Sequence, residues 1–114
     1  MPYRKKVCRY KPEETLYATI SPANDGYYKW TVEIPIESFE ISFGRADGND
    51  YLETNNEHIK DYYIDNHQRR ERWCFDGHNT AGFWSRWVSF NMPTLHQSLE
   101  DIYQRFNIDV EYIE

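Results

Sequence analysis

Residues 94–106 read Thr-Leu-His-Gln-Ser-Leu-Glu-Asp-Ile-Tyr-Gln-Arg-Phe, and this stretch decides most about the fold. Thr94 stands three residues before Gln97, the spacing of a capping box, which satisfies the first backbone amides of a helix. The apolar side chains that follow recur at helical spacing and share one face: Leu95, Leu99, Ile102, Tyr103 and Phe106. The sequence therefore predicts a C-terminal helix from Leu95 to Phe106 that buries this face.

The N-terminal half offers an apolar surface for that helix to cover. Residues 15–20, 27–34 and 39–43 are rich in β-branched and aromatic side chains, which favour strands. The turn residues 21–26 join the first two runs into a hairpin. Alternation along these runs places two sets of side chains on one face: Tyr28, Trp30, Val32 and Ile34, then Phe39, Ile41 and Phe43. We expect the C-terminal helix to pack on this sheet.

The segments between the sheet and this helix are predicted from shorter signals. Asn55 or Asn56 can cap a helix, with an apolar stripe of Ile59, Tyr62, Tyr63 and Trp73. Residues 44–50 have loop composition, and residues 81–90 predict a helical turn or short helix. Two further strands are predicted, a weak one at Tyr3–Arg9 and an edge strand at residues 108–113.

Together these elements predict one α+β domain spanning residues 1–114. Residues 1–45 are mainly strands and form a small antiparallel sheet. Residues 55–107 are mainly helical, and two or three helices cover the sheet. A chain of 114 residues with 18% aromatic side chains can bury one adequate core.

Charge and cysteine content restrict the location and the partners. The formal net charge is −6, which disfavours nucleic acid as a general partner. No apolar run is long enough to span a membrane, and the basic residues 1–8 lack the apolar segment of a secretory signal. Cys8 and Cys74 are predicted to be free thiols in a reducing compartment, with a disulfide as the alternative. We therefore expect a protein that is neither secreted nor held in a membrane.

The aromatic block at residues 80–87 reads Thr-Ala-Gly-Phe-Trp-Ser-Arg-Trp. The pattern continues after the block at single positions: Asn91, Pro93, Thr94, Leu95, Ser98, Asp101, Ile102, Arg105 and Phe106. This pattern resembles a family of small uncharacterised proteins of large DNA viruses and phages. The resemblance covers roughly residues 38–108. It implies a fold and a viral source, and with that source a location in the host cytoplasm or the virion; it brings no activity with it.

Two interpretations of the aromatic block are open. The block can be a core plug, with Gly82 allowing close packing and Arg86 pairing with an acidic neighbour. It can instead be a docking surface, because Trp and Arg are common anchors of protein interfaces. The interaction candidates are Phe83, Trp84, Arg86, Trp87, Trp73 and His67.

A nucleic-acid site is the alternative to a protein interface. Arg69, Arg70 and Arg72 stand beside Trp73, so the arginines could follow phosphates while aromatic rings stack on bases. The plainer interpretation is a solvated helix end, where cations meet the negative end of the helix dipole.

Catalytic and metal patterns are weak in this sequence. His58 and His67 differ by nine residues and cannot share a helix face, and residues 47–50 lack the spacing of a calcium loop. We therefore predict no metal, no cofactor and no catalytic residue. A hydrolase using His67 with Asp61 or Asp65 is the weakest hypothesis. The favoured one is a non-enzymatic viral protein-binding module, either a virion component or an inhibitor or modulator of a host factor; its oligomeric state stays open.

Overall fold

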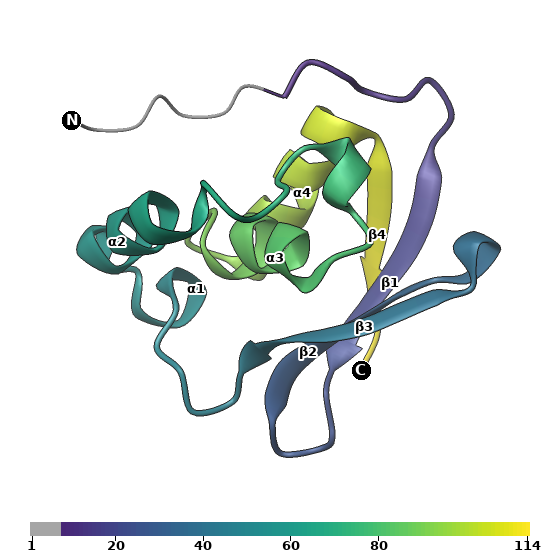
Figure 1. The fold of residues 1–114 in the computed structure, drawn as a ribbon. Coiled ribbons are helices and arrows are strands. Elements are labelled where there is room, and N and C mark those ends of the chain that lie inside the picture. Colours follow the sequence, from purple (N-terminus) through teal and green to yellow (C-terminus); the bar gives the residue numbers. More distant parts are fainter. Residues whose placement is uncertain (1–7) are drawn as a thin grey trace.

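A computed structural model describes residues 8–114 and shows a four-stranded sheet with all its helices on one face (Figure 1). The strands are β1 (Leu16–Pro22), β2 (Tyr28–Ile34), β3 (Phe39–Arg45) and β4 (Ile108–Tyr112), in the order β3-β2-β1-β4. The first three are antiparallel, as predicted, whereas β4 runs parallel to β1 and makes the sheet mixed. Most of the predicted strand Tyr3–Arg9 lies outside the described residues.

The helical half forms a second layer over this sheet. Its elements are α1 (Tyr51–Thr54), α2 (Glu57–His67), η2 (Phe75–Gly77), α3 (Ala81–Trp84), η3 (Ser85–Ser89) and α4 (Leu95–Phe106); a short turn, η1 (Pro35–Glu37), joins β2 to β3. η3 is a π-helical stretch that continues α3, so the predicted short helix is confirmed. Within residues 8–114, no helix is long and apolar enough to cross a membrane. The α+β fold class is confirmed.

The C-terminal helix is where the sequence predicts it. Thr94 caps it by accepting from the amide of Gln97, and Ile102 and Phe106 are fully buried. Two details differ from the prediction. Tyr103 is 44% exposed, and Ser98 is fully buried instead. α4 also packs mainly against β4 and η3, while α3 and η3 cover β3. The helix therefore reaches the N-terminal strands largely through the aromatic block.

The apolar stripe predicted for α2 is only partly right. Asn56 caps the helix by accepting from the amide of His58, as one of the two predicted options. The buried side chains of α2 are Tyr63 and Ile64, whereas Tyr62 is 73% exposed. Since α2 ends at His67, Trp73 lies beyond the helix in the following loop. The helix thus presents an apolar side chain to solvent where a core residue was expected.

The prediction of two free thiols is wrong. Cys8 and Cys74 form a disulfide, and their Cα atoms lie 5.1 Å apart. Tyr10 packs edge-on against Phe75, which brings the same two segments together. Asn107 fixes the next part of the N-terminal segment by donating to the carbonyls of Pro12 and Glu13. Two cysteines 66 positions apart cannot be predicted to pair from their spacing alone, because the distance between them depends on the whole fold.

Candidate functional site

Glu71 is the hub of a polar cluster at the end of α2. One carboxylate oxygen, Oε1, accepts from the hydroxyl of Tyr63 at 2.8 Å and from the indole of Trp73 at 3.0 Å. The other, Oε2, accepts from Nδ1 of His67 at 2.8 Å. A Cβ atom on Gly82 would lie about 2.9 Å from the Glu71 carboxyl carbon, so the glycine allows this close packing. The cluster joins α2, the loop after it and α3.

Tyr63 lies at the centre of an aromatic stack beside this hub. Its ring is parallel to that of Phe90, with centroids 3.8 Å apart, and His67 stacks on it at 4.2 Å. Burial raises the pKa of the Tyr63 hydroxyl well above its usual value, and the neighbouring Glu71 charge raises it further. Tyr63 therefore stays a neutral hydrogen-bond donor.

Arg86 is held by aromatic rings and a carbonyl. Its guanidinium lies 4.4 Å from the ring centroid of Trp87 and 5.5 Å from that of Trp73, and it donates to the carbonyl of Phe90 at 2.6 Å. Burial lowers the pKa of Arg86 to about 10, with Arg105 adding like-charge repulsion. Cation–π contacts take the place of the acidic partner expected for Arg86. They hold its side chain among the rings, so Arg86 has a structural role.

An inner cleft of about 270 Å³ opens beside the stack. Eleven residues from β2, β3, the β3–α1 loop, α2 and the region of η3 line this inner cleft: Lys29, Gly44, Arg45, Gly48, Asn49, Asp50, Tyr63, His67, Ser85, Ser89 and Phe90. Most atoms that face it are carbon. The ammonium of Lys29 is already engaged by the carbonyl of Gly48 and the carboxylates of Asp50 and Glu53. The cleft is therefore apolar in its walls and close to neutral in charge.

One polar atom on a residue of the inner cleft lacks a partner within residues 8–114. The hydroxyl of Ser89, a residue 1% exposed, makes no hydrogen bond. The Glu71 carboxylate only accepts, so Nδ1 of His67 beside it carries a proton. The Ser89 oxygen has almost no accessible surface, so it is not open to a ligand in the cleft.

An outer groove of about 560 Å³ adjoins the inner cleft. The two hollows share Asn49, Tyr63, His67 and Phe90, and the outer groove adds His58, Ile59 and the exposed Tyr62 of α2. Its surface is almost entirely apolar. An apolar groove that leads into a deeper cleft is typical of a binding site.

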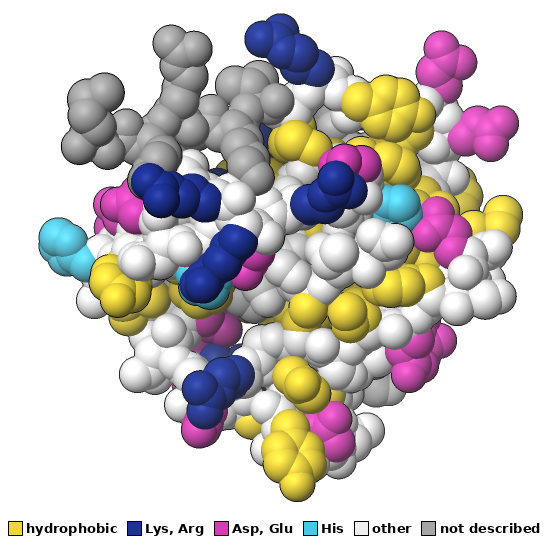
Figure 2. Space-filling model, in the orientation of Figure 1, with side chains coloured by type: hydrophobic (Ala, Val, Ile, Leu, Met, Phe, Trp, Pro, Cys, Tyr) yellow, Lys and Arg dark blue, Asp and Glu magenta, His cyan; other side chains and the backbone are white. Residues whose placement is uncertain are grey.

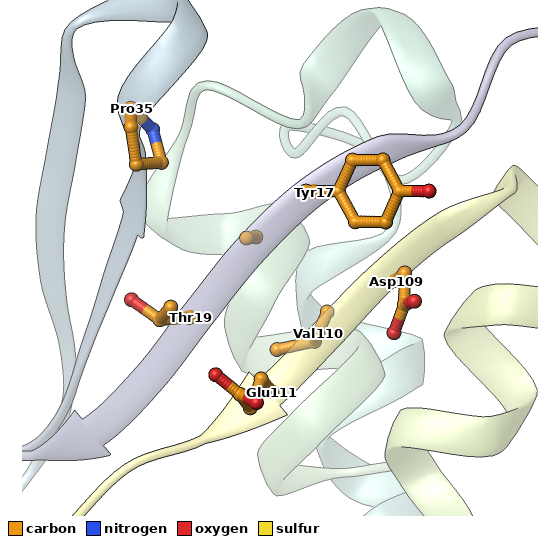
Figure 3. Close-up of a pocket in the computed structure, with 7 residues that line it drawn as sticks. Tyr17, Thr19, Pro35, Asp109, Val110 and Glu111 are labelled. Carbon is orange, nitrogen blue, oxygen red and sulfur yellow. The ribbon is translucent and has the colours of Figure 1, made fainter.

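Another hollow lies on the opposite side of the sheet, between β1 and β4 (Figure 3). Tyr17 lies beside Asp109 there, and Thr19 beside Glu111, because these residues pair in register. The lining holds two carboxylates and no lysine or arginine. We assign no site to this open, acidic surface.

The structure separates the predicted interaction residues into two groups. Trp73, Phe83, Trp84 and Trp87 are at most 5% exposed, so the aromatic block is a core plug. Phe83 and Trp87 both pack on Phe106 of α4. Arg86 is held among those rings. Of the six candidates only His67, with its side chain 32% exposed, lines a cleft.

The residues of the nucleic-acid alternative lie on the surface. Arg69, Arg70 and Arg72 are exposed, and Arg72 pairs with Asp76 at 3.6 Å. Trp73 beside them is buried and offers no stacking surface. On the face seen in Figure 2, lysine and arginine side chains are scattered among acidic and apolar ones. The indole of Trp73 therefore cannot serve as a stacking platform beside the arginines.

The two carboxylates named in the hydrolase hypothesis lie outside the inner cleft. Asp61 and Asp65 are exposed and do not line the inner cleft; the carboxylate that His67 contacts is Glu71. Glu71, Ser89 and Phe90 were missed as site residues. The only signal for Glu71 is its i,i+4 spacing from His67. Ser89 and Phe90 carry no signal, because their role depends on the π-helical turn of η3.

No protein-family model, curated protein or solved structure matches this chain. The resemblance to the viral family therefore stays a prediction.

Proposed function

We propose that the domain is a protein-binding module that holds a segment of a partner chain in the outer groove. The observation that carries this proposal is the exposure of Tyr62 on α2, next to Ile59 and the inner cleft. A large aromatic side chain exposed at the rim of an apolar groove stabilises a complex through burial when a partner covers it. This proposal moves the interface from the aromatic block to α2.

The disulfide bears on where such a module works. Disulfides persist in virions and at cell surfaces and are rare in reducing compartments. Of the two forms of the proposal, the Cys8–Cys74 bond favours a virion component over an inhibitor in the host cytoplasm. The source in a virus or phage rests on the family resemblance.

Selection from a random peptide library displayed on phage tests the proposal. Enriched peptides should lose at least about tenfold in affinity when Tyr62→Ser and Ile59→Asn are combined, because a buried aromatic anchor contributes more than 1 kcal/mol. Tyr17→Ser is the matched control, since Tyr17 is 65% exposed on the opposite side of the sheet. Absence of enrichment, or equal binding to all variants, would refute the proposal.

The nucleic-acid alternative is tested by salt. Binding through Arg69, Arg70 and Arg72 would weaken steeply as salt concentration rises, because phosphate contacts release counterions. Replacing all three arginines by Gln should abolish that dependence. Affinity that is unchanged by the triple substitution excludes this site.

A further inference from the structure

We infer that the groove between α4 and β4 binds a basic segment of a partner protein, with an arginine or lysine side chain held against tyrosine rings and carboxylates. We call it the edge groove, because β4 lies at the edge of the sheet. α4 contributes His96, Leu99, Glu100 and Tyr103 to its lining, and β4 contributes Asp109 and Tyr112. With a volume of about 520 Å³, it is large enough for a short peptide segment. The edge groove shares no lining residue with the inner cleft or the outer groove, so the inference is independent of the proposed function.

The apolar part of the edge groove is a flank of α4 that the rest of the domain leaves uncovered. Ile102 turns into the core and is fully buried, whereas Leu99 is half-buried and Tyr103 is 44% exposed. Tyr112 of β4 is 42% exposed, and its ring packs edge-on against Trp30, which holds it in place. Two large exposed rings beside one hollow form an apolar patch that a partner would cover.

The charge around the edge groove is negative. From α4 to the C-terminus the chain carries five carboxylate side chains and one cation, Arg105, which pairs with Asp101 at 2.7 Å. Glu100 pairs only with exposed His96, and exposed Asp109 makes no ion pair within the described part of the chain. The described lining therefore holds two carboxylates and no lysine or arginine to balance them.

The rings and carboxylates together favour a cationic side chain. An ammonium or guanidinium group over the face of a tyrosine ring is attracted by the ring, and nearby carboxylates add to this attraction. The methylene stem of an arginine or lysine can cover Leu99 and Tyr103 while the charged head stays beside the carboxylates. An acidic segment would be repelled, and a purely apolar one would leave the carboxylates without a counterion.

Titration with three short peptides tests the inference. The probes are acetyl-Leu-Arg-Leu-Arg-amide and its counterparts with glutamine or glutamate in place of arginine. The arginine peptide should shift the ring resonances of Tyr103 and Tyr112 and should bind at least about threefold more tightly than the glutamine peptide. The glutamate peptide should bind more weakly than both. The affinity of the arginine peptide should fall as the salt concentration rises, because salt screens charges at an exposed site.

Charge-neutralising variants separate the edge groove from the net charge of the protein. Glu100→Gln combined with Asp109→Asn should weaken binding of the arginine peptide at least about threefold. Asp61→Asn combined with Asp65→Asn is the matched control, because it removes the same charge from exposed positions of α2 outside the edge groove. The control should change the affinity by less than about twofold. All four positions are exposed, so both proteins should stay folded.

Substitutions of Tyr103 test the contribution of the ring. Tyr103→Ser should weaken binding of the arginine peptide by about two- to fivefold, whereas Tyr103→Phe keeps the ring and should retain the affinity. Equal affinity for the three peptides, no binding of the arginine peptide, equal losses in the two charge variants, or shifts centred outside α4 and β4 would overturn the inference. A dimer that Tyr103→Ser dissociates in light scattering would assign the edge groove to a second copy of the chain and would overturn it as well.

Discussion

His67 donates from Nδ1 to Oε2 of Glu71 at 2.8 Å across the end of α2, four residues apart in the chain. The contact closes the cluster that also holds Tyr63 and Trp73. The contact orients the imidazole, which also stacks on Tyr63 beside the inner cleft. A hydrogen bond across the end of α2 thereby fixes one side chain of the candidate site.

Glu71→Ala should destabilise the domain by about 2–4 kcal/mol. The substitution leaves the Tyr63 hydroxyl and the Trp73 indole without their acceptor, and each buried unsatisfied donor costs about 1–3 kcal/mol. Urea denaturation measures the change in the free energy of unfolding. Glu100→Ala is the control, since Glu100 pairs only with exposed His96 and should change stability by less than about 0.5 kcal/mol. Equal effects at both positions would contradict the role of Glu71 as a hub.

The domain should become less stable above about pH 10, because the unfolded chain then loses the Tyr63 hydroxyl proton. Its pKa is raised in the folded protein, so the unfolded chain loses this proton first as the pH rises. The stabilisation is complete below the unfolded pKa and declines at higher pH by up to about 1.4 kcal/mol per pH unit.

Comparison with Tyr63→Phe isolates this effect in urea unfolding between pH 8 and 11. Arg86 acts in the opposite direction, because its pKa is lowered to about 10 and the folded protein loses that proton before the unfolded chain does. Since both proteins contain Arg86, the difference between their free energies of unfolding reports Tyr63. A difference that does not change with pH would show that Tyr63 is not buried as described.

Cys8→Ser should lower the free energy of unfolding by about 2–4 kcal/mol. The disulfide closes a loop between residues 66 positions apart, and opening it returns conformational freedom to the unfolded chain. Mass spectrometry after alkylation without reductant should find no free thiol in the wild type. Reductant should destabilise the wild type and leave Cys8→Ser unaffected; alkylation of both cysteines in the native protein would disprove the bond.

For three alanine substitutions in α4, the loss of stability should increase with the burial of the side chain that is removed. Ile102→Ala should cost about 2–5 kcal/mol, because the side chain is fully buried. Leu99→Ala should cost less, since Leu99 is only half-buried, and exposed Gln104→Ala should change stability by less than about 0.5 kcal/mol. Thermal unfolding followed by circular dichroism gives the ranking. Equal midpoints for all three would mean that this helix is not part of the core.

Local patterns in the sequence were sufficient for the strands of the N-terminal half and for the longest helix. Strand alternation in residues 28–34 and 39–43 and the capping box at Thr94 predicted β2, β3 and α4, because these signals act within a few residues. The parallel pairing of β4 with β1 did not follow from any local pattern. It joins Leu16 to Ile108 across the length of the chain.

The candidate site depended on the tertiary structure more than the individual strands and helices did. The sequence by itself identified His67 and the aromatic block as candidate site residues. It also placed Tyr62 on the apolar face of a helix. Only the fold decided that Trp84 and Trp87 are buried while Tyr62 is exposed, because burial depends on which faces meet. The same holds for the Cys8–Cys74 pair and for Ser89, a buried residue of the cleft lining whose hydroxyl has no partner in the described chain. Periodicity records which way a side chain points along its own element; what it then meets is decided by packing between elements distant in sequence.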